Sequence, residues 1–330
     1  MVHVDPLRIG VVGVGSLGFH HTRLLAGLPA VVLAGVHDIR ADRAAEVGTQ
    51  LGVRVHPTLE GLLDEVDACV IAVPTEAHEE VATAALERGI AVLIEKPIAS
   101  TLAAADRILA AARRSGALVQ TGHVERFNGA LRACEPFLEA PVFVESHRLA
   151  PFGPRGTDVP VVLDLMIHDL DLVLSLMKRD VVSVAAVGVP VLTQSPDIAN
   201  ARLEFAGGGV ANLTASRVSL ERMRKIRFFQ PSGYISLDLA AGTGEFLRLR
   251  AAAAGDGAPF VGARIEDIVE RVPLQSDGTE PLCAELESFI DAVCGRRSVA
   301  VSGDEGRRAL AVALDIVNRI EANVAHQSLA

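Results

Sequence analysis

The sequence predicts an α/β protein in which a doubly wound parallel sheet is followed by a second, β-rich domain. From Leu7 onward, short β-branched runs alternate with alanine-rich helical stretches, which is typical of βαβ units. After Pro141 the runs become longer and richer in strand-forming residues. A chain of 330 residues with 50% hydrophobic content is long enough for two domains. We expect them at residues 1–122 and 123–330, with the C-terminal helices packing back on the first.

The first domain is expected to contain alternating strands and helices of ordinary length. Its strands are short apolar runs, and its helices carry apolar residues at helical spacing. The expected strands are 8–12, 31–37, 68–73, 91–94 and 118–121, and the expected helices are 17–27, 41–51, 77–88 and 102–114.

The turn after the first expected strand carries the glycine pattern Gly13-Val14-Gly15-Ser16-Leu17-Gly18. Gly13 allows a tight turn, Gly15 lets the backbone approach a pyrophosphate, and Gly18 lets helix and strand pack closely. Ser16 and Leu17 then lie at a helix N-terminus that faces the phosphates. Because a strand precedes this pattern and a helix follows it, we expect a Rossmann-type dinucleotide site.

Asp38 follows the last glycine by about 20 residues, at the end of the second expected strand. A carboxylate there can accept hydrogen bonds from ribose hydroxyls and repels a 2′-phosphate, which favours NAD over NADP. Arg40 lies two residues later and weakens this preference slightly. A helix N-cap is the alternative role for Asp38.

Two further strand ends are expected to face the cofactor, because ligands of open α/β sheets bind beyond the carboxyl ends of the strands. Pro74, Thr75 and His78 follow the third strand, and Glu95 and Lys96 follow the fourth. Proline at position 97 biases Lys96 toward an extended backbone, and a cis bond is an open alternative at this position.

Residues 161–177 are expected to form a largely buried helix, since they are apolar almost all round. One narrow stripe of this helix is polar, and it consists of Asp164, His168, Asp171 and Ser175. Carboxylates and an imidazole are costly in a buried helix unless a polar cleft or ligand meets them. This stripe is therefore a candidate active site, although a local Asp–His hydrogen bond would also explain the pair.

The rest of the second domain is expected to be mainly strands, with two helices at the end. The expected strands are 181–191, 199–205, 210–217, 226–230 and 234–239, and the expected helices are 280–294 and 304–325. The triple glycine 207–209 joins two strands and predicts a hairpin turn, not a phosphate loop. We expect a flexible turn at 251–257 and a solvated strand face for the basic run 216–227.

Composition excludes several classes of protein. A net charge of −10 argues against a nucleic-acid or anionic-membrane surface, which needs a broad basic face. No apolar run approaches the roughly 18 residues of a membrane span, and no signal core follows Met1, so we expect a cytoplasmic protein. The cysteines are scattered without metal-ligand spacing, and we expect reduced core thiols and no metal.

With GVGSLG, VPTEAH, EKP and DLMIH in this order, the chain resembles the Gfo/Idh/MocA oxidoreductase family over nearly its whole length. The resemblance implies a Rossmann domain followed by an α+β domain with an open-faced mixed β-sheet that builds homodimers or homotetramers. It also implies hydride transfer between a nicotinamide and a sugar or cyclitol carbon, with Lys96, Asp164 and His168 as the catalytic trio. Met166 replaces a glycine that is common in the family, a departure that narrows the pocket or shifts the helix.

A narrower resemblance lies in GHVERFN, DLMIHDLDL and residues 197–239. These segments look like the branch of the family that oxidises the 3-hydroxyl of UDP-N-acetylglucosamine in the route to the lipid A of lipopolysaccharide. This resemblance implies a UDP-sugar substrate. For its recognition we expect contacts from His123, Arg126, Arg148 and Arg155, with the last two placed to meet a pyrophosphate.

In such a reaction His168 suits a general base, since an unperturbed histidine has a pKa of about 6.5. Lys96 would stabilise the developing alkoxide, and Asp164 would hold a neighbouring hydroxyl. Three alternatives stay open. The substrate is a free sugar or an inositol-like cyclitol, the chain is a non-catalytic NAD-binding regulator, or Asp164, His168 and Asp171 bind a divalent metal in a hydrolase.

Overall fold

A computed structural model describes residues 6–153, 159–250 and 264–327, and its contacts divide the chain into two compact units. Unit 1 comprises residues 1–124 and 280–310, and unit 2 comprises 125–279 and 311–330. This division differs from a single cut after residue 122, because helix α9 (Pro281–Val293) and the start of α10 (Gly303–Gln327) belong to unit 1. The turn expected at 251–257 and Arg155 lie outside the described residues.

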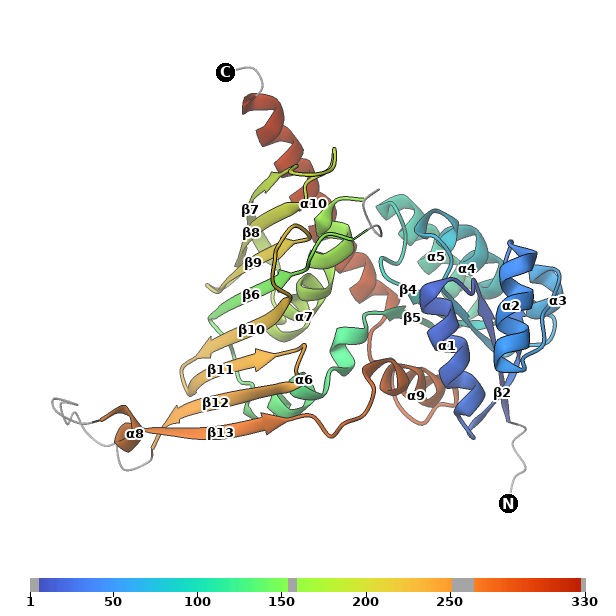
Figure 1. The fold of residues 1–330 in the computed structure, drawn as a ribbon, viewed down its shortest axis with the longest axis horizontal. Coiled ribbons are helices and arrows are strands. Elements are labelled where there is room, and N and C mark those ends of the chain that lie inside the picture. The colour runs from blue at the N-terminus through green and yellow to red at the C-terminus, as the bar shows by residue number, and fades with distance from the viewer. Residues whose placement is uncertain (1–5, 154–158, 251–263, 328–330) are drawn as a thin grey trace. The chain divides into compact units, whose positions relative to one another are not determined.

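Unit 1 is built on a parallel five-stranded sheet (Figure 1). Its order is β2 (Val31–His37), β1 (Leu7–Val12), β3 (Ala68–Ile71), β4 (Ala91–Glu95) and β5 (Val119–Gly122). The connecting helices are α1 (Ser16–Gly27), α2 (Ala41–Leu51), α3 (Leu59–Leu63), α4 (His78–Leu86) and α5 (Leu102–Ser115). The strand order reverses direction between β1 and β3, which is where ligands bind in sheets of this topology.

The core of unit 1 explains why the short apolar runs form strands. Ile9, Val70 and Leu93 come from neighbouring strands and are fully buried together. Helix α9 contributes Leu286 and Phe289 to the same cluster, although it comes almost 200 residues later in the sequence. The expected parallel sheet is therefore confirmed, and part of its core comes from the C-terminal region.

Unit 2 is built on a mixed eight-stranded sheet in which only β6 and β9 are parallel neighbours (Figure 1). Its order is β13 (Val269–Gln275), β12 (Thr243–Leu249), β11 (Gly233–Asp238), β10 (Met223–Gln230), β6 (Phe143–Leu149), β9 (Val210–Ser216), β8 (Ile198–Phe205) and β7 (Val181–Val189). Strands β6, β12 and β13 are absent from the sequence prediction. Gly207 and Gly208 have positive φ in the turn between antiparallel β8 and β9, so the expected hairpin is confirmed.

One face of the second sheet packs on helices and the other is open. Helices α6 (Gly129–Cys134) and α7 (Ile167–Met177) contact the inner face. Strand β8 shows the resulting alternation, since Ala201 and Leu203 are buried while Arg202 is exposed. Short helix α8 (Ile265–Ile268) precedes β13.

The described part of the chain has no helix with the length and apolar character needed to cross a membrane. All four cysteines are free thiols. Burial raises the pKa of Cys69 and of Cys134 to about 12, as expected for core thiols. Cys294, in contrast, is exposed, so the expectation of a core position is wrong for this residue.

Candidate active site

The glycine turn after β1 leaves space for a phosphate group. Gly13 has φ of 84°, and a Cβ at this position would lie 2.7 Å from the carbonyl oxygen of Ala72. A Cβ on Gly18 would collide with the Gly13 carbonyl, so only glycine lets α1 pack this closely. A Cβ on Gly15 would meet nothing within 4 Å. The first turn of α1 holds exposed Ser16 and Leu17 and no acidic residue, so its N–H groups suit a pyrophosphate.

Asp38 lies at the end of β2, beside the glycine turn. Its Oδ2 accepts a hydrogen bond from the Val14 N–H at 2.8 Å, and its Oδ1 accepts one from the Arg40 N–H at 2.9 Å. The Arg40 side chain is mostly exposed and its Nε lies 3.8 Å from Oδ1, which makes it a weak partner. A carboxylate has about four lone-pair sites, so ribose hydroxyls can still donate to Asp38.

His78 is buried behind the turn that follows β3. Its Nδ1 lies 3.0 Å from the carbonyl oxygen of Pro97, and its Nε2 lies 3.0 Å from that of Val73. Burial lowers the pKa of His78, against the opposing effect of the two carbonyls, and the neutral ring donates to one carbonyl at a time. His78 therefore supports the turn, while exposed Pro74 and partly exposed Thr75 are better placed for a cofactor.

Lys96 follows β4 and is partly exposed, and its peptide bond to Pro97 is cis. The preceding residue, Glu95, is buried and accepts a hydrogen bond from His21 Nε2 at 2.8 Å and one from the Lys96 N–H at 3.2 Å. Burial raises the pKa of Glu95, but the His21 hydrogen bond and the charges of His21 and Lys96 more than offset this, so the net shift is downward. Glu95 is thus an ionised support for the turn, not an exposed cofactor ligand.

Glu285 of α9 brings a carboxylate near the same place. Among the described residues, His21, Glu95 and Glu285 have potential metal-ligand atoms within 4.8 Å of one another. His21 and Glu95 form a direct hydrogen bond, which explains their proximity without a cation.

In unit 2 the expected helix 161–177 has two parts. A π-helical turn, Val162–Met166, precedes α7. Asp164 lies in the π turn and His168 lies in the first turn of α7, and both are partly exposed. Wider i→i+5 turns of this kind occur frequently at functional sites.

Two arginine forks hold α7, one from the sheet and one from the turn Val124–Phe127. Arg148 of β6 binds Asp169 through Nε–Oδ2 at 2.8 Å and Nη2–Oδ1 at 3.0 Å, and it also donates to Glu125 at 2.8 Å. Arg126 binds both carboxylate oxygens of Asp171. Burial opposes the charge of Arg148, but the two carboxylates raise its pKa above the ordinary value. Because Asp171 already has these partners, its position does not favour the metal hypothesis.

A further buried ion pair anchors the chain that enters the π turn. Asp197 accepts a hydrogen bond from Arg217 Nε at 2.8 Å and further hydrogen bonds from the backbone N–H groups of 191–193. Burial opposes ionisation of Asp197, but these donors hold its pKa below the ordinary value. Arg217 also donates to the carbonyl of Val159 at 2.7 Å. The sequence predicts a solvated strand face for the basic run 216–227, but Arg217 is buried.

The predicted substrate residues have different surroundings. His123 is 1% exposed, and Arg148 is 4% exposed and bound to two carboxylates. The Arg126 side chain is 15% exposed next to Asp171. Sequence reasoning missed His21, Glu125, Asp169 and Asp197. Of these, only Asp169 lies in a largely apolar stretch, and the neighbours of the other three give no local signal.

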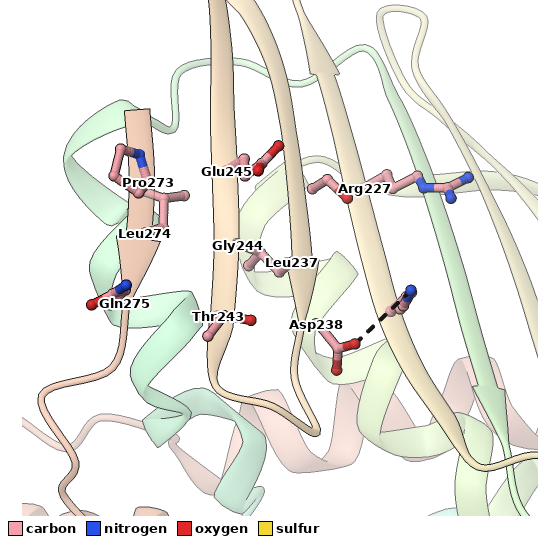
Figure 2. Close-up of a pocket in the computed structure, with 11 residues that line it drawn as sticks. Arg227, Leu237, Asp238, Thr243, Gly244, Glu245, Pro273, Leu274 and Gln275 are labelled. Carbon is pink, nitrogen blue, oxygen red and sulfur yellow. Dashed lines mark ion pairs between the residues drawn. The ribbon is translucent and has the colours of Figure 1, made fainter. Parts of the chain in front are cut away.

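A separate hollow of about 390 Å³ lies on the outer face of the second sheet, across β10 to β13 (Figure 2). Its walls carry Arg227, Glu245 and an ion pair between Lys225 and Asp238 at 3.9 Å. None of the predicted site residues lines it.

Comparison with known proteins identifies the family of both parts of the chain. Residues 7–123 match the model of an oxidoreductase family with an NAD-binding Rossmann fold, and residues 144–236 match the GFO/IDH/MocA C-terminal domain. The UDP-N-acetylglucosamine 3-dehydrogenase of Acidithiobacillus ferrooxidans is 39% identical over 98% of this chain and 99% of its own length.

Two further comparisons agree, one with a solved structure and one with a sequence relative. The solved structure of the Acidithiobacillus ferrooxidans enzyme superposes with a TM-score of 0.87, at 38% identity, over 96% of this chain and 98% of that one. The myo-inositol 2-dehydrogenase of Thermotoga maritima is 26% identical over 92% of this chain and 93% of its own length.

Proposed function

This chain belongs to the Gfo/Idh/MocA family of oxidoreductases, and on that premise we propose that it oxidises the 3-hydroxyl of UDP-N-acetylglucosamine to a 3-keto sugar with NAD. The observation that carries the proposal is the 39% identity, over almost the full length, to an enzyme with that activity in its name. The sequence also keeps Lys96, Asp164 and His168, which a non-catalytic NAD-binding regulator would not need.

The glycine turn and Asp38 are the part of unit 1 that fits the cofactor. Open space at Gly15, the uncapped start of α1 and the Asp38 carboxylate match a pyrophosphate and a ribose. A bound nicotinamide would supply the hydride acceptor. Gly13, Gly15, Ser16, Leu17 and Gly18 would hold the phosphates, and Pro74 and Thr75 would line the nicotinamide end.

His168 is the general base of the proposed reaction. An imidazole nitrogen takes the proton of the 3-hydroxyl while the hydride leaves the carbon, so a ketone and a protonated histidine result. The Lys96 ammonium stabilises the oxygen as negative charge develops on it, and Asp164 binds a neighbouring hydroxyl and orients the sugar. Among the predicted substrate residues, Arg126 and Arg155 contact the nucleotide part of the UDP-sugar.

The test is NADH formation with a panel of substrates: UDP-N-acetylglucosamine, other UDP-sugars, free sugars and inositols. We expect kcat/KM to be highest for UDP-N-acetylglucosamine and the product to be its 3-keto form by mass and NMR. Preference for an inositol would favour the second candidate, which rests on relatives such as the 26% identical myo-inositol dehydrogenase. A silent panel with intact NAD binding would favour the regulator.

Cofactor choice gives a prediction about Asp38. Replacing Asp38 by alanine should raise the Kd for NAD roughly tenfold or more, since hydrogen bonds to a charged group contribute about 1.5–3 kcal/mol. NADP should lose less affinity, because the repulsion of its 2′-phosphate is removed. Calorimetric titration with both cofactors measures the ratio, with the exposed Asp42→Ala variant as control. An unchanged NAD preference in Asp38→Ala would refute the ribose assignment.

We also propose that the open outer face of the second sheet pairs with a second copy, giving a homodimer or homotetramer. This face carries a row of aromatic rings, with centroids 5.2 Å apart for Phe143–Phe229 and 4.8 Å apart for Phe229–Tyr234. The chain is only 4% aromatic, so such a row on an open face favours an interface.

Phe229→Asp is therefore expected to yield monomers in sedimentation velocity experiments. Leu220→Asp is the control, because Leu220 is fully exposed, and this variant should leave the assembly intact. A Phe229→Asp protein with the mass of the wild-type assembly would contradict the proposed interface.

As its cellular setting we propose the cytoplasm and the synthesis of diamino-sugar lipid A. The argument for this biosynthetic route is chemical, because a 3-keto sugar is the class of compound that a transaminase converts into a 3-amino sugar.

A further inference from the structure

Lys96 lies between two residues that are each held by a buried histidine. His21 of α1 donates from Nε2 to Glu95 Oε1 at 2.8 Å, and His78 of α4 lies with Nδ1 3.0 Å from the carbonyl oxygen of Pro97. The two rings are 0% and 1% exposed. They contact the residues immediately before and after the lysine, from two different helices.

The His21 contact fixes the Glu95 carboxylate. One carboxylate oxygen binds the imidazole, and the other accepts the backbone N–H of Lys96 at 3.2 Å. Close packing limits its movement further, since a Cβ at Gly122 would lie only 3.2 Å from Glu95 Oε2. The carboxylate thus connects helix α1 to the backbone nitrogen of the lysine.

The His78 contact joins two strand ends. Its second nitrogen lies 3.0 Å from the carbonyl oxygen of Val73, which precedes Pro74 and Thr75 at the proposed nicotinamide end. Because the His78 ring lies between the carbonyls of Val73 and Pro97, it fixes the distance between the turn after β3 and the turn after β4. The sequence suggested cofactor binding for His78, but both nitrogens face backbone carbonyls.

We propose that His21 and His78 are positioning residues that hold the backbone of Lys96 so that its ammonium reaches the reacting oxygen. The proposal rests on the proposed function only for the role of Lys96. A lysine side chain is long and flexible, so the direction in which it leaves the backbone decides where the ammonium lies. A misplacement of about 1 Å at a reacting group can reduce the rate about 100-fold.

The sequence allows the position of Lys96 to be observed without any activity assay. The chain contains only three lysines, Lys96, Lys178 and Lys225, so protein labelled with ¹³C at the lysine ε-carbons gives few signals. Lys178→Arg and Lys225→Arg variants assign them. We expect His21→Asn and His78→Asn each to shift the Lys96 signal and leave the signals of Lys178 and Lys225 unchanged.

Activity supplies the second readout. We expect kcat to fall by up to about 100-fold in each variant, with a much smaller change in the KM of the sugar and in the Kd of NAD. His21→Gln, whose longer side chain can bring an amide donor to the place of Nε2, should restore part of kcat. Should His21→Asn fail to fold, Glu95→Gln tests the same contact, because it keeps the shape of the side chain and removes its charge.

His56→Asn is the matched control, because His56 is also a buried histidine of unit 1 and bonds the carbonyl of Ala34 at 3.4 Å. It should leave kcat and the Lys96 signal unchanged. An unshifted Lys96 signal in His21→Asn and His78→Asn, or an equal shift in His56→Asn, would overturn the proposal. If wild-type protein oxidises no sugar, the proposed function fails, while the NMR comparison still decides the role of the histidines.

Discussion

Replacing His168 by alanine is expected to lower kcat by roughly 10² to 10⁴, the range that general acid–base catalysis supplies. His168 is partly exposed in the first turn of α7, directly after the π turn that carries Asp164. Alanine is the strongest helix former, so the variant should keep the helix and lose only the imidazole. The loss should therefore appear in kcat, with little change in KM, when NADH formation is followed at saturating NAD.

Ser175→Ala is the control for this experiment. Ser175 lies on the same helix and in the same predicted polar stripe, but its hydroxyl donates to the carbonyl of Leu172, one turn earlier. We expect its kcat to equal that of the wild type. Near-normal turnover in His168→Ala would remove His168 from the mechanism, and an equal loss in Ser175→Ala would indicate general damage to α7.

The first unit could be predicted almost completely because its signals are local. The alternation of apolar strands and helices, and the glycines with their special backbone requirements, are determined within a few residues. Helix α9 and its packing on the first domain were expected, but which of its residues enter the core of unit 1 depends on contacts across most of the chain length. No local pattern contains that information.

The strands of the second sheet were predicted less well for two identifiable reasons. In β6 the inward positions include Ser146 and Arg148, so the strand lacks the apolar alternation that marks a half-buried strand. In β13, Pro273 argues against a strand, yet β13 is the edge of the sheet, where proline is tolerated. Both exceptions result from tertiary position.

Helix α7 and the π turn before it show the same limit. The sequence placed Asp164, His168 and Asp171 on one stripe of a regular α-helix, but the π turn changes the spacing around Asp164. Asp171 binds Arg126, which is 45 residues away in the sequence. The apolar neighbours of a charged residue in the sequence indicate that it is buried, but only the fold shows which residue of opposite charge binds it.

Arg148→Met is expected to lower the free energy of unfolding by roughly 3–5 kcal/mol, the usual effect of removing one partner from a buried ion pair. The guanidinium has two carboxylate partners, Asp169 and Glu125, and all three side chains are less than one tenth exposed. Methionine fills most of the volume but leaves Asp169 without its charged donor and Glu125 with only the partly exposed Arg224, at 3.6 Å. Urea unfolding followed by circular dichroism measures the difference between variant and wild type.

Arg227→Met provides the matched control, because Arg227 binds Glu145 at 2.9 Å while its side chain is 42% exposed. An exposed pair contributes about 0–1 kcal/mol, so this variant should unfold almost like the wild type. A triple variant that also converts Glu125 and Asp169 to leucine should recover much of the stability, since no buried charge is then left unpaired.

The experiment also decides between two roles for Arg148. Normal stability with a raised KM for UDP-N-acetylglucosamine would make it a substrate ligand, whereas low stability with an unchanged KM in the folded fraction would make it a support of the helix that carries His168.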